Sequence, residues 1–333
     1  PFTFSYDALG RPVAKAGVTS ADAVAYTYDT GTNGKGRLAQ AAYTSGKATF
    51  AYDAIGEEIA STKTLGSTTY SVGRTYDALG RLKTVAYPDG KSTALYTYNA
   101  AGQLYSLVLK VVNGTTTTQK AIITRIDYTV NGSIQKIYYG NGAIAGYVYD
   151  ARTERLTIMA VVDKNSVAVQ YNNYYYDPAG NIIKIFDRVK NVYKFYTYDP
   201  LNRLVSSKDG AEAVITYQYD QTGNILRKGN LSYTYGQNGA GLHAVTTISD
   251  GTLMAYDANG NMTSYKTAAK TQYYTYDTSN RLTKVEAVNT GTTARYPLAA
   301  FSYDGDGGRT QKKIIRLNAC SLLVQITDKR RVR

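Results

Sequence analysis

The sequence of 333 residues predicts an all-β fold, in which tandem β-hairpins form one curved or spiralling sheet. Three observations predict it. Some version of a Tyr-Asp-x-x-Gly motif recurs fourteen times, a second aromatic residue usually precedes each copy, and an aliphatic residue usually follows at one common offset. Self-similarity at a short period is typical of arrays in which each unit buries its apolar face against its neighbours.

The tyrosine of the motif sets the length of the repeat. From the first to the last tyrosine there are 297 residues in thirteen intervals of 16 to 30 residues, with a mean near 23. Clear copies lie at 6–11, 76–82 and 176–182. The anchoring tyrosines are Tyr6, Tyr28, Tyr52, Tyr76, Tyr98, Tyr128, Tyr149, Tyr176, Tyr198, Tyr219, Tyr235, Tyr256, Tyr276 and Tyr303.

Each motif predicts a tight reversal of the chain. The aspartate suits the first position of a type I turn, and the glycine suits a residue with positive φ, which gives a hairpin with a bulge at the glycine. Twelve of the fourteen copies have Gly or Asn four residues after the tyrosine, and the exceptions, Thr32 and Thr153, lie in longer turns. The predicted structural turn residues include Asp7, Gly10, Asp53, Gly56, Asp77, Gly80, Asp177, Gly180, Asp199, Asn202, Asp220, Gly223, Asp257, Gly260, Asp277 and Asn280.

The residues around each turn predict two strands with one aromatic face. In eleven copies a second aromatic residue precedes the anchor by two positions, and side chains two apart lie on one face of a strand. Aliphatic residues past the turn, such as Leu82 and Ile182, can pack across the hairpin on these rings. The predicted inner-face aromatics are Tyr96, Tyr98, Tyr174, Tyr176, Tyr196, Tyr198, Tyr217, Tyr219, Tyr274 and Tyr276.

Composition agrees with a sheet and excludes several classes of protein. There are 34 Tyr, 6 Phe and no Trp, which suits a face that is packed at its base and is wet, or covered by another polypeptide, at its surface. No window has a useful helical period, and no apolar run reaches the roughly eighteen residues of a membrane span. The chain begins inside a repeat without Met or a signal peptide, which suggests a piece of a longer protein.

The charge divides the chain into residues 1–311, the repeats, and 312–333, a basic tail that does not match them. The net charge is +13, of which the tail supplies +6 from seven basic residues and Asp328. Because the remaining charges are scattered rather than gathered in a stripe, we expect no specific nucleic-acid partner.

We find no catalytic, cofactor-binding or metal-binding motif, and we expect no enzymatic activity. His243 is the only histidine, so a hydrolytic triad or a histidine-rich metal site cannot be built around it alone. Cys320, the only cysteine, excludes an internal disulfide and has no histidine near it in sequence. The segment 304–307 lacks the ligand series of a calcium loop and is better explained as a turn.

Residues 76–82 (YDALGRL) and 176–182 (YDPAGNI) closely resemble the Rhs or YD-repeat family, and the resemblance covers essentially 1–311. It implies a long β-ribbon that spirals into a hollow shell or barrel, as in bacterial insecticidal toxin complexes, Rhs polymorphic toxins and teneurins. In the bacterial members the shell holds a toxic C-terminal domain until delivery. The resemblance therefore implies a secreted or cell-surface location, with the rest of a larger shell and an enclosed toxin or effector polypeptide as partners.

The last residues depart from the family pattern. Members continue into a plug whose aspartates are thought to release the toxin by self-cleavage, and 314–333 does not match it. We therefore expect neither protease nor toxin activity in this chain. The size of the chain also favours a wall segment. A closed spherical sheet of 333 residues, at ~16 Å² for each residue, leaves an inner radius of about 15 Å. A small folded domain has an outer radius of ~17 Å and would not fit inside it.

Two alternatives stay open at this point. A seven-bladed β-propeller would use two hairpins per blade, although intervals as uneven as 16 and 30 residues fit it poorly. A carbohydrate-binding adhesion module that recognises surface glycans would also use rows of aromatic rings, although the absence of Trp counts against it. A container requires the aromatic pairs to face a concave interior, whereas an adhesin requires an aromatic cluster on the convex side.

Overall fold

The computed structural model describes residues 2–17, 23–305, 307–315 and 324–325. Nearly all regular structure in these ranges is β-strand, and the one helical element is a single 3₁₀ turn, η2 (Gln237–Gly239). The chain divides into two compact units, one formed by Pro1–Val72 with Leu231–Arg333 and the other by Gly73–Asn230. The predicted all-β fold of tandem hairpins is confirmed.

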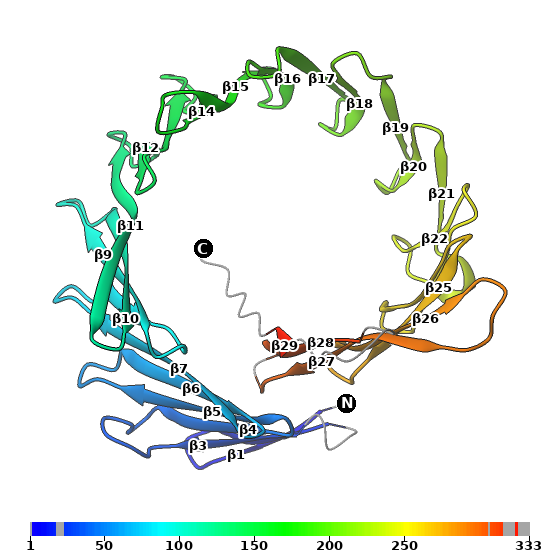
Figure 1. Cartoon of the computed structure of the whole chain (residues 1–333). Coiled ribbons are helices and arrows are strands. Elements are labelled where there is room, and N and C mark those ends of the chain that lie inside the picture. The colour runs from blue at the N-terminus through cyan, green and yellow to red at the C-terminus, as the bar shows by residue number, and fades with distance from the viewer. Residues whose placement is uncertain (1, 18–22, 306, 316–323, 326–333) are drawn as a thin grey trace. The chain divides into compact units, whose positions relative to one another are not determined.

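The second unit is a continuous antiparallel meander that curves along its length (Figure 1). Each strand within it pairs with the strand before it and the strand after it in sequence. After β7 (Thr68–Tyr76), which crosses the residue where the units divide, its strands are β8 (Leu82–Ala86), β9 (Ser92–Tyr98), β10 (Leu104–Asn113), β11 (Thr116–Tyr128), β12 (Ile134–Tyr139), β13 (Ile144–Tyr149), β14 (Leu156–Val162), β15 (Ala168–Tyr176), β16 (Ile182–Asp187), β17 (Val192–Tyr198), β18 (Leu204–Asp209), β19 (Ile215–Tyr219) and β20 (Ile225–Lys228).

This unbroken pairing decides against the propeller. In a propeller, backbone pairing stops at the edge of each four-stranded blade. In the second unit it runs from β7 to β20 without such a break. An open curved sheet therefore describes this unit.

The first unit contains two runs of the same meander. Consecutive strands pair antiparallel in both. One run consists of β1 (Thr3–Tyr6), β2 (Pro12–Ala16), β3 (Val24–Tyr28), β4 (Leu38–Tyr43), β5 (Gly46–Tyr52) and β6 (Glu58–Leu65), and the other of β21 (Leu231–Tyr235), β22 (Val245–Ile248), β23 (Leu253–Tyr256), β24 (Met262–Lys266), β25 (Lys270–Tyr276), β26 (Leu282–Asn289), β27 (Tyr296–Tyr303), β28 (Arg309–Ile314) and β29 (Val324–Gln325).

Within the first unit the two runs contact each other at the last turn. Lys63 Nζ lies 2.8 Å from Asp304 Oδ2, and the Asp304 side chain is only 7% exposed. The hydroxyl of Ser45 donates to the carbonyl of Tyr303 at 3.2 Å. A Cβ on Gly305 would come within 2.8 Å of Val24, so this turn is packed closely against β3. Residues 241 positions apart are thus joined by an ion pair.

The core is thin because a single sheet has no opposing layer. The buried apolar side chains among the described residues are mostly alanines, such as Ala41, Ala145 and Ala287, and no large side chain is fully buried. The tyrosine faces are half-buried instead. Contacts between successive repeats must therefore supply much of the stability.

The predicted boundary between repeats and tail, at 311/312, falls within β28. Most of the tail, 316–323 and 326–333, lies outside the described residues, and so does Cys320. The division into 1–311 and 312–333 stays a prediction.

Candidate functional site: the tyrosine ladder between repeats

The turn at Asp77 represents the hairpin end of a repeat. Gly80 N–H donates to the Asp77 carbonyl at 3.0 Å, and Asp77 N–H donates to the Arg81 carbonyl at 2.9 Å. The carboxylate of Asp77 accepts from the N–H groups of Leu79 and Arg81 at 2.9 and 3.0 Å. Gly80 has φ of 73°. This is a type I turn followed by a left-handed residue in a bulge.

The same backbone conformation recurs along the chain. All twelve Gly and Asn residues four positions after the anchor have positive φ, including Asn202 at 59° and Asn280 at 58°. In the two longer turns other residues take positive φ, among them Gly36 and Glu154. After Tyr235 the pattern differs, because Gly236 replaces the aspartate and η2 forms the turn. The aspartates that accept from turn N–H groups include Asp7, Asp53, Asp177, Asp199, Asp220, Asp257 and Asp277.

A second bulge, which the sequence analysis missed, follows every turn. Tyr76 pairs with Leu82 while Thr75 pairs with Thr84, so Lys83 is the extra residue. The same shift in register occurs beside all fourteen anchors. Because the next strand, β9, pairs with β8 only from Thr84 onward, the carbonyl of Leu82 meets no backbone donor on that side.

The anchoring tyrosine of the next repeat supplies the missing donor. Tyr98 Oη donates to the Leu82 carbonyl at 2.7 Å. We call the series of such bonds, at 2.7 to 3.0 Å, the tyrosine ladder. In each bond the accepting residue pairs with the preceding anchor. The donors are Tyr28, Tyr52, Tyr98, Tyr128, Tyr149, Tyr176, Tyr198, Tyr219, Tyr256 and Tyr303.

Arginine adds a second link between repeats. Arg81 forms an ion pair with Asp77 at 2.7 Å, and its guanidinium lies 4.5 Å from the ring centre of Tyr98 in the next repeat. The same ring contact is made by Arg11, Arg37, Arg155, Arg203 and Arg281.

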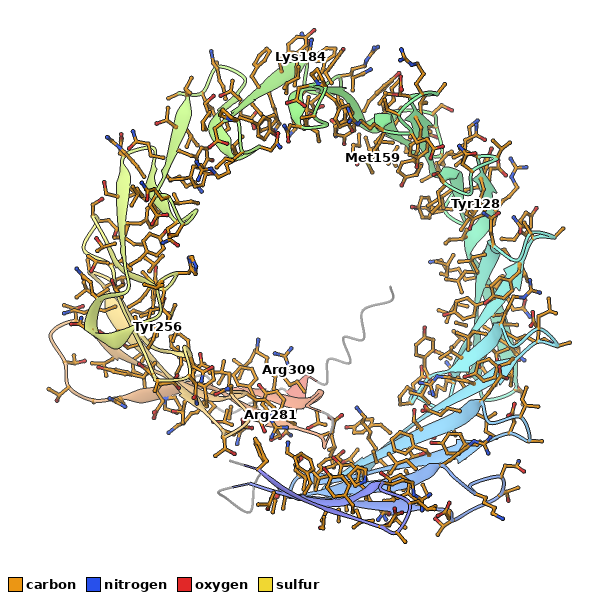
Figure 2. All side chains as sticks on the ribbon, turned by 180° about the vertical axis from the view of Figure 1, so that it is seen from behind. Tyr128, Met159, Lys184, Tyr256, Arg281 and Arg309 are labelled. Carbon is orange, nitrogen blue, oxygen red and sulfur yellow. The ribbon has the colours of Figure 1, made fainter. Side chains whose placement is uncertain are left out.

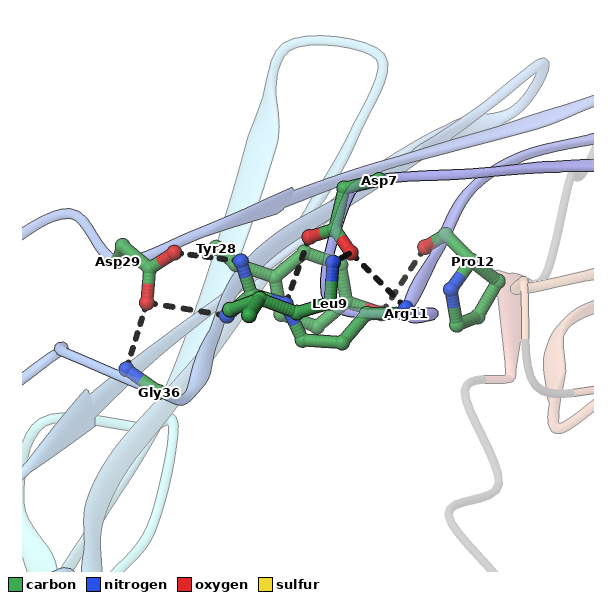
Figure 3. Close-up of polar contacts among 7 residues, drawn as sticks. All are labelled: Asp7, Leu9, Arg11, Pro12, Tyr28, Asp29 and Gly36. Atoms are coloured by element: carbon green, nitrogen blue, oxygen red, sulfur yellow. Dashed lines mark hydrogen bonds and ion pairs between the residues drawn. The ribbon is translucent and has the colours of Figure 1, made fainter.

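The first two repeats show both links together (Figure 3). Arg11 bonds Asp7 within its own turn and binds both carboxylate oxygens of Asp29 in the next turn, at 3.0 and 2.6 Å. Tyr28 Oη donates to the carbonyl of Pro12 at 3.0 Å. Where asparagine replaces the arginine it bonds similarly, since Asn181 Nδ2 donates to Asp177 at 2.9 Å.

These contacts shift the pKa values in two directions. The hydrogen bond from Arg11 lowers the pKa of Asp29 to about 2. Burial opposes ionisation of Asp220, but hydrogen bonds from Thr222 and Asn224 outweigh it and hold its pKa at about 2. Burial raises the pKa of Tyr98 and of Tyr198 in the ladder. Neutral tyrosine and ionised aspartate are therefore the forms that the fold favours.

The two faces of the sheet in the second unit differ. Figure 2 places Met159 on the concave side and Lys184 on the convex side of this unit. Met159 pairs with Asn172, which shares a face with Tyr174 and Tyr176. Tyr174 and Tyr176 therefore lie on the same face as Met159, and from the register of the sheet we infer the same side for the ladder and the other predicted aromatic pairs of this unit. They are half-buried: Tyr96, Tyr98, Tyr174, Tyr176, Tyr196, Tyr198, Tyr217 and Tyr219. In the first unit Tyr274 and Tyr276 are likewise half-buried.

The aromatic residues two positions before the anchors form a second tyrosine row with different bonding. Among the described residues, Tyr96, Tyr147 and Tyr196 have no hydrogen-bond partner for their hydroxyls. Tyr174 and Tyr217 make only long contacts of 3.4 Å. One row of hydroxyls is thus bound to the wall, and the other row includes hydroxyls without a close hydrogen-bond partner among the described residues.

Histidine and metal-ligand chemistry are the other candidates that the sequence raises. His243 lies in the exposed loop before β22. The described residues include no group of three His, Cys, Asp or Glu side chains that could hold a metal ion. No helix in the same ranges is long and apolar enough to cross a membrane.

Comparison with known proteins supports the resemblance that the motif indicates. A family model described as RHS Repeat matches residues 76–118. The tRNA3(Ser)-specific nuclease WapA of Bacillus spizizenii is 28% identical over 70% of this chain and 9% of its own length. The toxin subunit YenC2 of Yersinia entomophaga is 27% identical over 52% of this chain and 21% of its own length. The resemblance to the Rhs/YD-repeat family is confirmed.

A solved structure shows the same fold. In the crystal structure of TcdB2-TccC3-Cdc42, one chain superimposes with a TM-score of 0.78 at 20% identity, covering 94% of this chain and 18% of that chain. This chain therefore spans a small part of each of these proteins.

Proposed function

We propose that this chain is a wall segment of a larger YD-repeat shell, that its concave face shields an enclosed toxin or effector polypeptide, and that the segment itself performs no catalysis. The observation that carries the proposal is the pair of tyrosine rows on the concave face. In the ladder row the tyrosine hydroxyls donate to backbone carbonyls of the wall itself and so join successive repeats. The second row offers hydroxyls such as those of Tyr96 and Tyr196, which can bond the backbone of an enclosed chain without selecting its sequence.

Two further features support a wall. Backbone pairing in the second unit continues from strand to strand, which leaves no seam through which a protease could reach an enclosed chain. The similar proteins are much longer than this chain, so the remainder of such a protein would supply the rest of the wall and the cargo. In this proposal an activity such as that named for WapA belongs to a cargo, and the protein acts after secretion or at a cell surface.

The test uses adjacent residues on opposite faces. A photo-crosslinking amino acid is placed at Tyr174, on the concave face, or at Tyr175, on the convex face, in the complete product of the reading frame that contains this chain. We expect crosslinks from position 174 to a polypeptide segment outside the wall, identified by mass spectrometry, and none to that segment from position 175. Equal crosslinking from both positions, or none from 174, would contradict enclosure.

Protease protection gives a second readout. The enclosed segment should resist trypsin in the native protein and become sensitive when the ladder is weakened by Tyr176→Phe and Tyr198→Phe together. If the same segment is digested equally fast in the unaltered protein, the wall does not shield it.

A further inference from the structure

The convex face of the second unit carries an aromatic cluster of its own. Lys184 lies on this face (Figure 2), and it pairs with Tyr175 on β15 and Phe195 on β17. Phe186 pairs with Asn173 and Tyr193, on the same face. We call Tyr171, Tyr175, Phe186, Tyr193 and Phe195, with Lys184 and Arg188, the convex aromatic patch. Tyr175, Tyr193 and Phe195 are 39%, 42% and 46% exposed.

The repeat itself does not require this patch. The residue just before the anchor is Tyr only at 175, and the other thirteen repeats have Ser, Thr, Ala, Asp, Val or Gln there. In other repeats a small polar residue at this position hydrogen-bonds the residue opposite it in the hairpin. The hydroxyl oxygens of Thr97 and Ser106 lie 2.7 Å apart, and those of Thr197 and Ser206 lie 2.6 Å apart. A large exposed ring replaces that pair at one place in the array.

The rings already cover much of one another's faces. Phe186 and Tyr193 stack at 4.3 Å with 11° between planes, and Tyr193 lies 6.0 Å from Phe195. Lys184 Nζ lies 3.8 Å from the ring centre of Tyr175. Flat ligands such as bases and sugar rings need a free ring face on which to stack. Because these contacts already use ring faces within the patch, we expect the remaining surface to suit the packing of aliphatic side chains better than stacking.

The charge on this face has one sign. Lys184 and Arg188 belong to the patch, and the exposed Lys208 pairs with Phe195. The acidic residues of the neighbouring strands face the other way, since Asp187 pairs with Asn172 and Asp209 with Lys194. A partner that covers the patch must therefore offer carboxylates to avoid burying unpaired cations.

A groove adjoins the patch and extends it toward the turns. Its volume is about 680 Å³, and its lining includes Thr153, Arg155, Tyr175, Ile183, Lys184 and Phe195. Two carboxylates also border it. Asp150 and Asp177 accept N–H bonds of their own turns and stay ionised, so the preference for acidic partners belongs to the patch and not to the groove.

We propose that the convex aromatic patch docks a protein segment that carries alternating aliphatic and acidic side chains. Exposed tyrosine beside arginine, with no acidic side chain among the residues of the patch, is typical of the centre of a protein interface rather than of a plain solvated surface. The charge argues against two other occupants. A second copy of this chain has a net charge of +13, and residues 312–333 carry seven basic residues and one acid.

The test measures fluorescence anisotropy of labelled probes with the whole chain, and each peptide probe has twelve residues. The probes are an alternating Val–Glu peptide, its Val–Lys and Val–Gln counterparts, a dodecathymidylate and a hexauronate. We expect the Val–Glu peptide to bind at least tenfold more tightly than either counterpart, and to weaken several-fold when salt is raised from about 50 to 500 mM, as exposed charge pairs do.

Variants locate the binding. Tyr175→Thr restores the residue common in other repeats, so the fold should be kept, and we expect it and Lys184→Gln each to weaken Val–Glu binding about tenfold. Tyr105→Thr and Lys83→Gln change exposed residues at bulges elsewhere in the same unit and should leave binding unchanged. Failure of the Val–Glu peptide to bind, or equal loss in the control variants, overturns the proposal.

The other probes separate the remaining occupants. Binding of the thymidylate or the uronate in place of the peptide, lost in Tyr175→Thr, would show a different ligand class and overturn the proposal. Concentration-dependent dimers in analytical ultracentrifugation that Tyr175→Thr abolishes would also overturn the proposal, because they would show that a second copy of this chain covers the patch. None of these results depends on whether the concave face encloses a polypeptide.

Discussion

At the scale of the residue, the hydroxyl of the anchoring tyrosine determines how a repeat joins the one before it. Replacing Tyr198 by Phe removes the donor to the Ile182 carbonyl, which lies at a bulge. A backbone carbonyl left without a partner in a half-buried site costs about 1–3 kcal/mol. We expect Tyr198→Phe to lower the free energy of unfolding by that amount in urea titrations.

Tyr196→Phe is the matched control for that change. Tyr196 lies two residues away on the same strand and face, and its hydroxyl has no hydrogen-bond partner among the described residues. Its loss should change the free energy of unfolding by less than about 0.5 kcal/mol, as is usual for changes away from such contacts. Equal losses from the two variants would mean that the ladder bond adds no stability.

The turn glycine is the second residue whose role can be isolated. Gly80 has φ of 73°, a conformation that L side chains rarely adopt, so a substitution there strains the backbone. Gly80→Val forces a β-branched residue to positive φ and should cost roughly 1–3 kcal/mol. Gly80→Asn should cost clearly less, because Asn202 and Asn280 take the same conformation. Thermal melting compares the two, and an unchanged midpoint for the valine variant refutes the requirement.

At the scale of the element, arginine couples one hairpin to the next. Arg203 pairs with Asp199 at 2.7 Å and lies 4.7 Å from the ring centre of Tyr219. A cation over a partly exposed ring is worth about 0.5–1 kcal/mol. A double-mutant cycle of Arg203→Gln with Tyr219→Leu should give a coupling energy in that range.

The cycle needs a reference pair. Arg203→Gln with Tyr98→Leu joins residues in different hairpins that share no contact, so their effects should add within about 0.5 kcal/mol. A coupling energy for the contacting pair no larger than this reference would show that the arginine stabilises only its own turn.

The hairpins could be predicted from sequence, whereas the link between them could not. Gly and Asn mark the turn because few other residues take positive φ, so residue type and backbone conformation correspond directly. The second bulge has no such marker, since its extra residue is Lys83, Tyr105, Ile183 or Val205 in different repeats. The direction of the tyrosine hydroxyl follows from that bulge. Sequence reasoning assigned the polar tips of the tyrosines to the surface, whereas ten of the 34 tyrosines bind the wall itself through a ladder bond.

At the scale of the whole molecule, many weakly shifted groups add up to a pH dependence. Burial raises the pKa of tyrosines such as Tyr98, Tyr128 and Tyr176 above the ordinary value of about 10. The unfolded chain therefore loses these protons first as pH rises, and the folded state loses stability above about pH 10. We expect the melting temperature to be level near neutral pH and to fall steeply above about pH 10.

At low pH the slope of stability against pH has the opposite sign, because the aspartates determine it. The pKa of Asp29 and of Asp220 is about 2 in the folded state, below the ordinary value near 3.9. The unfolded chain takes up these protons first, so stability that is present at pH 5 is lost between about pH 4 and pH 2. Melting curves across both ranges check the two signs. A midpoint that rises in acid or alkali would contradict the assignment of charged aspartate and neutral tyrosine.

Because ten anchoring tyrosines reach back with their hydroxyls to the preceding repeat, a unit of the ladder carries the donor for the unit before it and the acceptor for the unit after it. An in-frame duplication or loss of one complete period leaves a matching donor and acceptor at the new junction. A junction in the middle of a period leaves either the donor or the acceptor without its hydrogen-bond partner. Genes for such proteins can therefore change in length by recombination between copies of the motif, and the walls they encode can widen or narrow without any new contact having to arise.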